Sequence, residues 1–197
     1  NDMEQPLSKG IPAFWARKVG TMFSNIDVTN SGVLTKSAVR SAAGRFKKYY
    51  NMEDEDAERI VHAYYMLFHI MAPHKDSITR EEFINTVWRA SFGKTEATLN
   101  RYKNAYSAIF DVIETAKKGR MSFEEFKSYW HMQKWNDSLC EATFKWMDKE
   151  NNGYVTKEQF NDMALAYYDL DDIVDGVEAD EEDGLHTGYN LMWGPIA

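Results

Sequence analysis

The stretch Asp148–Gln159, "DKENNGYVTKEQ", places oxygen-bearing groups at regular intervals around a single glycine, Gly153. A twelve-residue calcium loop takes oxygen ligands from places one, three, five, seven, nine and twelve, with glycine at place six for the sharp turn. The sequence matches this spacing and therefore predicts a metal-binding loop. The predicted oxygen donors are Asp148, Glu150, Asn152, the Tyr154 carbonyl, Thr156 and Gln159.

The last place of this loop holds Gln159 where a calcium loop usually has glutamate. A glutamate gives two charged oxygens to the ion, whereas an amide has one carbonyl oxygen and no charge. Because ligand charge sets affinity, we expect the change to cost roughly 2–4 kcal/mol, which is tens- to hundreds-fold in affinity. The loop is therefore predicted to bind calcium weakly or to have lost it.

Four segments of the chain share one plan, in which a helix-like apolar pattern, about a dozen polar residues and a second helix-like pattern follow one another. The polar stretches are residues 27–38, 71–82, 114–125 and 148–159. The eighth place of each is apolar: Leu34, Ile78, Met121 and Val155. An apolar residue also follows each stretch directly: Val39, Phe83, Phe126 and Phe160. Further apolar residues precede each stretch by four places and by one, a spacing that puts them on one helical face.

A helix–loop–helix unit of this kind is the EF-hand. Four such units predict an all-α fold of two EF-hand pairs, followed by a C-terminal tail. We expect residues 1–90 to form the first pair, residues 91–168 the second, and residues 169–197 an acidic linker and an apolar tail. The eighth-place residues should meet in a short two-stranded β contact within each pair. Leu191, Met192 and Trp193 are expected to bury apolar area and anchor the tail.

The first loop is predicted to be the second-best site. Its donors by position are Asp27, Thr29, Ser31, the Val33 carbonyl and Thr35. Its twelfth place is Ala38, which donates nothing, so one carboxylate and three neutral side-chain oxygens remain. The site is therefore expected to be weaker than the fourth loop.

The second and third loops are predicted to hold no metal. The second starts with Met71, and has Pro73 and Lys75 at ligand places. The third has Ala116 at its third place and Lys118 at its fifth, so that an ammonium group stands where a ligand belongs.

The overall composition argues against several other functions. The stretch 169–183 carries nine acidic residues and no basic one, while the rest of the chain is close to neutral, so no basic face for nucleic acid is expected. No apolar run approaches the roughly 18–20 residues needed to span a membrane. No catalytic motif is present, so we expect a binding protein and not an enzyme. One cysteine, Cys140, allows no internal disulfide, which fits a reducing compartment. We expect a cytoplasmic monomer, while secretion after removal of a leader stays open.

The sequence resembles the invertebrate sarcoplasmic calcium-binding proteins. The likeness rests on the four-unit layout across about residues 14–168, on "REEFINTVW" at residues 80–88, and on "GYNLMWGPIA" at residues 188–197. The hydrozoan photoproteins and luciferin-binding proteins belong to the same superfamily. The resemblance implies a compact globule and buffering of calcium or magnesium in muscle or neuron cytosol. Ala38 and Gln159 depart from the pattern of that family.

Two other functions stay open at this point. Aromatic residues and histidines could line an interior that holds a small hydrophobic aromatic ligand, as in photoproteins, although aromatics at helical spacing more often form core. The residues concerned are Trp15, Tyr64, Tyr65, Trp88, Trp130, Trp135, Trp146, Tyr167, Tyr168 and Trp193, with His62, His69, His131 and His186. Met22, Met66, Met71, Met147 and Met163 could instead serve a target-binding surface, but core packing is favoured for them.

Overall fold

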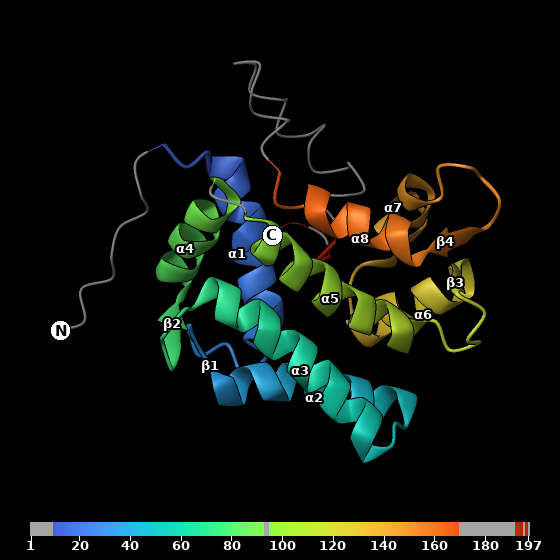
Figure 1. Cartoon of the computed structure of the whole chain (residues 1–197), viewed down its shortest axis with the longest axis horizontal. Helices are drawn as coiled ribbons and strands as arrows, with labels where there is room; N and C mark the ends of the chain where they lie inside the picture. Colours follow the sequence, from blue (N-terminus) through green and yellow to red (C-terminus); the bar gives the residue numbers. More distant parts are fainter. Residues whose placement is uncertain (1–9, 93–94, 170–191, 195, 197) are drawn as a thin grey trace. The chain divides into compact units, whose positions relative to one another are not determined.

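The computed structural model describes residues 10–92, 95–169, 192–194 and 196. The chain divides into two compact units, with unit 1 formed mainly by residues 1–101 and unit 2 by residues 102–196. Unit 1 contains two helix–loop–helix hands, and so does unit 2 (Figure 1). The division predicted from the sequence, with its boundary at residue 90 and a separate tail, stays a prediction.

In unit 1 the helices are α1 (Ala13–Ile26), α2 (Lys36–Tyr50), α3 (Asp54–Met71) and α4 (Arg80–Phe92). Strands β1 (Val33–Thr35) and β2 (Ser77–Thr79) lie in the two loops and pair antiparallel, with Leu34 opposite Ile78. The α2 helix packs along α3, and α1 packs against α4. The predicted pairing of the eighth-place residues is confirmed here.

Unit 2 repeats this plan. Its helices are α5 (Glu96–Ile113), α6 (Phe123–Met132), α7 (Cys140–Met147) and α8 (Lys157–Ala166), with a short 3-10 turn, η1 (Asp137–Leu139), before α7. Strands β3 (Arg120–Ser122) and β4 (Tyr154–Thr156) pair antiparallel, and Met121 lies opposite Val155. The all-α fold of paired EF-hands is therefore confirmed.

Aromatic residues flanking the loops join the first helix of each unit to its last. Phe23 of α1 meets Phe83 of α4 edge to face, with ring centroids 5.5 Å apart. Phe110 of α5 meets Phe160 of α8 in the same way at 5.7 Å. All four side chains are at most 2% exposed. The apolar positions that frame each loop thus form the core that holds the two loops of a unit side by side.

The described part of the C-terminal tail is buried against unit 2. Met192 is 4% exposed and Trp193 is 2% exposed, which agrees with the anchoring role expected for both. The indole Nε1–H of Trp193 donates to the Tyr106 hydroxyl at 2.9 Å. Leu191, the third expected anchor, lies outside the described residues.

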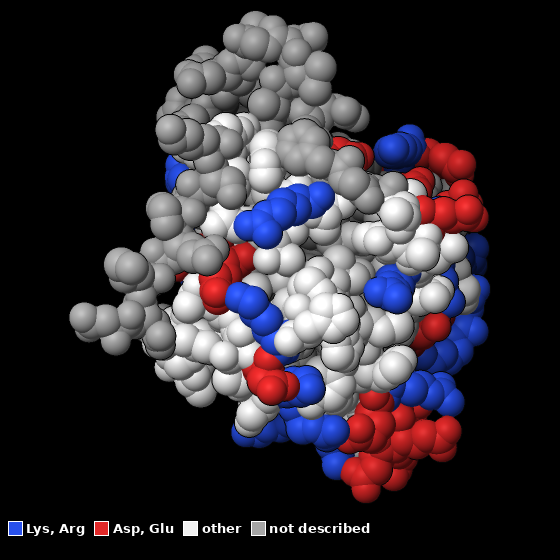
Figure 2. Space-filling view, turned by 60° about the vertical axis from the view of Figure 1, so that its left-hand side comes forward, with Lys and Arg blue, Asp and Glu red and all other residues white. Residues whose placement is uncertain are grey.

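None of the described helices is both long enough and apolar enough to cross a membrane. Acidic and basic side chains are interspersed on the molecular face shown in Figure 2.

Candidate metal-binding loops

Three of the four loops share a backbone arrangement built on the carboxylate at place one. That carboxylate accepts hydrogen bonds from the backbone N–H groups of places five and six, which draws the loop around it. In loop one Asp27 accepts from Ser31 at 3.0 Å and Gly32 at 2.7 Å. The same pair of bonds joins Glu114 to Lys118 and Gly119, and Asp148 to Asn152 and Gly153. Loop two starts with Met71 and cannot form these bonds.

The turn residues explain why the backbone can close in this way. The place-six glycines Gly32, Gly119 and Gly153 have φ of 77°, 74° and 85°, a region that L-residues with side chains rarely enter. The place-four residues Asn30, Lys117 and Asn151 also have positive φ. In loop two His74 takes this conformation at place four, although the place-six glycine is missing. The loop backbone conformation is therefore kept even in loops whose side chains are poor metal ligands.

The side chains at the first three predicted ligand places of loop four are hydrogen-bonded within the loop. The Asp148 carboxylate is held by the two backbone N–H groups, at 3.1 Å from Asn152 and 2.8 Å from Gly153. The Asn152 amide donates to the Glu150 carboxylate at 3.2 Å, so the side chains at places three and five are neighbours. Asn152 Oδ1 in turn accepts from the Tyr154 backbone N–H at 3.1 Å, so the oxygen donors at places one and five are both held by backbone N–H groups of the loop.

The last place of loop four is engaged in helix capping. Gln159 Oε1 accepts from the Thr156 backbone N–H at 2.9 Å, while the Thr156 hydroxyl accepts from the Gln159 backbone N–H at 3.2 Å. This reciprocal pair is a capping box at the start of α8. The single carbonyl oxygen of Gln159 therefore satisfies the helix terminus, and no second oxygen remains for an ion.

Loop one gathers its donors around the Asp27 carboxylate. The hydroxyls of Ser31 and Thr29 donate to Asp27 Oδ1 at 3.0 Å and 3.4 Å. Burial is the largest single influence on the Asp27 pKa and raises it, but the hydrogen bonds from Ser31, Gly32 and Thr29 together outweigh burial and lower the pKa below its usual value. Asp27 is therefore a stable anion at neutral pH.

The remaining predicted donors of loop one are also occupied within the loop. The Val33 carbonyl lies 2.8 Å from the Ser31 hydroxyl, whose single proton it shares with Asp27, and the Thr35 hydroxyl accepts from the Ala38 backbone N–H at 3.1 Å. Thr35 thus caps α2 while Ala38 at place twelve offers no side-chain oxygen. Loop one therefore offers a cation one carboxylate and no side-chain oxygen from place twelve.

Loops two and three tie up their place-twelve carboxylates internally. In loop two the Lys75 ammonium lies 2.6 Å from Glu82 Oε1, and Glu82 Oε2 accepts from the Thr79 backbone N–H at 3.0 Å. In loop three Glu125 accepts from the backbone N–H groups of Ala116 at 2.9 Å and Ser122 at 2.9 Å. The donor chemistry of these two loops does not fit a bound calcium ion.

The donor set as a whole is poor in charge. Within residues 10–92, 95–169, 192–194 and 196, no three His, Cys, Asp or Glu side chains lie close enough together to hold a metal ion. A site in loop four or loop one would therefore rely on amide, hydroxyl and backbone oxygens beside one or two carboxylates. The ligand sets predicted for these loops stay predictions.

The aromatic residues considered as lining an interior fall into two groups. Trp15, Tyr64, Trp130, Tyr167, Tyr168 and Trp193 are at most 2% exposed, whereas Tyr65, Trp88, Trp135 and Trp146 are partly exposed. His62, His69 and His131 are exposed, so their side chains do not contribute to a buried lining; His186 lies outside the described residues. Met22, Met71, Met147 and Met163 are buried in the core, and Met66 is partly exposed.

Unit 2 contains a buried cluster of contacting aromatic residues, two of which, Tyr102 and Tyr106, were not predicted from the sequence. Tyr106 and Tyr168 hydroxyls lie 2.6 Å apart, and Trp193 donates to Tyr106. The Tyr102 ring stacks at a tilt on Tyr168, with centroids 4.6 Å apart. Tyr102, Tyr106 and Ile113 recur on one face of α5, and this periodicity was the available signal for Tyr102 and Tyr106.

Comparison with known proteins finds one matching family and several similar solved structures. Residues 74–133 and 117–167 match the family described as EF-hand domain pair. A search of curated protein sequences found no match. Calcium-loaded apo-aequorin from Aequorea victoria is similar in structure, with TM-score 0.70 and 19% identity over 80% of this chain and 91% of that chain.

Two further structures cover nearly the whole chain. Okadaic acid binding protein 2.1 gives TM-score 0.72 and 17% identity, over 99% of this chain and 100% of that chain. The coelenterazine-binding protein from Renilla muelleri, in its calcium-loaded apo form, gives TM-score 0.63 and 20% identity over 96% and 100%. At these identities the likeness demonstrates the common fold.

Proposed function

We propose that this chain, which has the fold of the EF-hand calcium-binding proteins, is a sarcoplasmic-type protein with degraded calcium sites. Loop four is the best site and loop one the second, and magnesium can compete for both. The observation that carries the proposal is the hydrogen bonding of loop four, which wraps the backbone around the Asp148 carboxylate and pairs Glu150 with Asn152. The protein acts by binding, as a cytoplasmic monomer, and performs no catalysis.

The last ligand place of loop four makes the proposed site weak. Asp148 is already fixed by backbone hydrogen bonds, so the cost of ordering the loop is small and does not cause the weakness. Gln159 supplies one neutral oxygen, and that oxygen must leave the Thr156 N–H to reach the ion. The ion would therefore gain one poor ligand while the helix terminus loses a hydrogen bond, which is worth about 0.5–1.5 kcal/mol.

Native mass spectrometry of the protein from its source, with and without chelator, tests this proposal. We expect no calcium ion at micromolar free calcium and one ion at millimolar free calcium. Asp148→Asn should abolish that ion, because it removes the loop's fixed charge. The matched control is Glu114→Gln, the same change at place one of loop three, which should leave the ion count unchanged. Two or more ions at micromolar free calcium would contradict the proposal.

A second candidate function is the binding of a small hydrophobic aromatic ligand, independent of calcium. Tyr102 is 1% exposed, and its hydroxyl has no hydrogen-bond partner among the described residues. Burial raises the pKa of Tyr102, so the hydroxyl stays neutral and remains a donor. An unpaired buried hydroxyl costs about 1–3 kcal/mol, which an acceptor on a ligand would recover.

The structural neighbours named for okadaic acid and coelenterazine agree with this second candidate. The same mass spectra separate the two functions. A copurified organic molecule that survives chelator would favour the ligand carrier. Its loss from a Tyr102→Phe variant would place it at the Tyr102 hydroxyl.

A further inference from the structure

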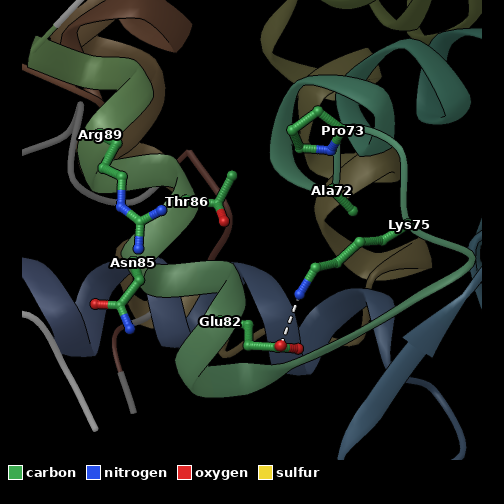
Figure 3. Close-up of a pocket in the computed structure, with 7 residues that line it drawn as sticks. All are labelled: Ala72, Pro73, Lys75, Glu82, Asn85, Thr86 and Arg89. Atoms are coloured by element: carbon green, nitrogen blue, oxygen red, sulfur yellow. Dashed lines mark hydrogen bonds and ion pairs between the residues drawn. The ribbon is translucent and has the colours of Figure 1, made fainter. Parts of the chain in front are cut away.

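We propose that a pocket beside loop two binds a small oxyanion, namely a carboxylate or a phosphate group. The pocket has a volume of about 250 Å³ and lies between α4 and the end of α3 (Figure 3). This volume is far above the roughly 10–15 Å³ that a cavity needs to hold one water molecule, so a small oxyanion fits. The proposal concerns a loop that cannot hold calcium, and it is independent of the function proposed for loop four.

One face of α4 supplies most of the polar lining. Glu82, Asn85, Thr86 and Arg89 follow one another at spacings of three, one and three residues, so they occupy successive turns of the same face. Figure 3 shows Lys75 reaching from the loop towards Glu82, while Asn85, Thr86 and Arg89 continue along α4. The opposite face of α4 carries the apolar residues Ile84 and Val87, which are 0% exposed and lie in the core of unit 1. The core thus fixes the helix and with it the spacing of the polar groups.

The charges of the pocket favour an anion. Lys75 and Arg89 contribute two positive charges, and Glu82 contributes one negative charge. Glu82 is satisfied, because one oxygen pairs with Lys75 at 2.6 Å and the other accepts from the Thr79 N–H. The Lys75 hydrogen bond and the Thr79 N–H lower the Glu82 pKa, so Glu82 is ionised at neutral pH. The pocket therefore keeps one net positive charge.

Two donors of the pocket are available to a ligand. Within the described part of the chain, neither the Arg89 guanidinium nor the Thr86 hydroxyl has a hydrogen-bond partner. The Lys75 ammonium has three N–H donors, of which Glu82 uses one. A guanidinium can give two parallel hydrogen bonds to one oxyanion, and the Lys75 and Thr86 donors can add to them. Arg89 is exposed, so the interaction should weaken as salt concentration rises.

An NMR titration of the full chain with inorganic phosphate, and separately with succinate, tests the proposal. The ionic strength is held constant with chloride. We expect saturable shifts of the backbone amides of Lys75, Thr86 and Arg89. Arg89→Gln should weaken binding at least tenfold, since it removes the net positive charge. The matched control is Arg59→Gln, an exposed arginine of α3 outside the pocket, which should bind as tightly as the unaltered protein.

A second variant tests the sign of the charge argument. Glu82→Gln removes the negative charge and releases Lys75, so it should tighten anion binding several-fold, which a purely structural role of Glu82 would not produce. Thr86→Val, a change of similar volume, should weaken binding by a few-fold and serves if Arg89→Gln does not fold. Binding of phosphate alone or of succinate alone identifies which oxyanion the pocket accepts. Shifts that never saturate, or equal affinities for Arg89→Gln and the unaltered protein, would overturn the proposal.

Discussion

Replacing Gln159 by glutamate should raise the calcium affinity of loop four by tens- to hundreds-fold. Glutamate restores a bidentate, charged ligand at place twelve, worth roughly 2–4 kcal/mol. The substitution leaves Asp148 in place, because that carboxylate is already bound to the N–H groups of Asn152 and Gly153. The expected gain in calcium affinity therefore comes from the side chain at position 159.

The substitution should leave the metal-free fold unchanged. Gln159 closes a capping box with Thr156, and glutamate performs the same role at that position. A helix N-terminus also favours a negative side chain, by about 0.3–1 kcal/mol. Any change in the free energy of unfolding without calcium should thus be small and stabilising, which separates the effect on binding from an effect on folding.

Isothermal titration calorimetry measures the affinity, and tryptophan fluorescence gives an independent signal. Trp146 lies at the end of α7, and Lys149 of loop four stands over its ring at 5.0 Å. A cation bound in loop four changes the charge close to this ring and should therefore alter its emission. The matched control is Glu158→Gln, a charge change one residue before place twelve, which should alter affinity by no more than a few-fold. Equal calcium affinities for Gln159→Glu and the unaltered protein would show that loop four is not the site.

The fold could be predicted from the sequence because its main determinants are periodic and local. Phe23, Phe83, Phe110 and Phe160 stand at fixed distances from their loops, and the structure brings them together as two edge-to-face pairs. The register of Leu34 with Ile78 and of Met121 with Val155 follows from the shared eighth place. Each of these relations repeats at a fixed spacing along the chain, so a single sequence is enough to reveal it.

The candidate site could be predicted only in part. The spacing of residues identifies the ligand places, but it does not show which hydrogen bonds or ion pairs each side chain forms. Lys75 was recognised as a poor ligand, yet its pairing with Glu82 requires two side chains to reach across seven residues. The contact between Tyr106 and Trp193 joins residues 87 positions apart, and no local pattern predicts such a pairing. Tertiary packing decided these interactions.

Truncation of Trp193 to alanine should lower the free energy of unfolding of unit 2 by about 3–5 kcal/mol, the range observed for deleting a fully buried tryptophan. The side chain is 2% exposed, its ring meets Tyr106 edge to face at 6.4 Å, and its Nε1–H donates to the Tyr106 hydroxyl. Trp193→Phe keeps most of the apolar area but loses the donor. It should cost less, about 1–2 kcal/mol. Urea unfolding of the full chain and of both variants measures the difference.

Gly194 provides an independent test of the same docking. A Cβ at this position would lie 2.6 Å from the Trp135 ring, and the residue has φ of 86°. Gly194→Ala should therefore destabilise unit 2 through both a steric clash and backbone strain, although it adds only a methyl group. Gly119→Ala is the matched control, because Gly119 has φ of 74° but no atom within 4 Å of the added Cβ. It should show the strain alone, about 1–2 kcal/mol. If Gly194→Ala costs no more than Gly119→Ala, and Trp193→Ala costs less than 1 kcal/mol, the tail does not stabilise unit 2.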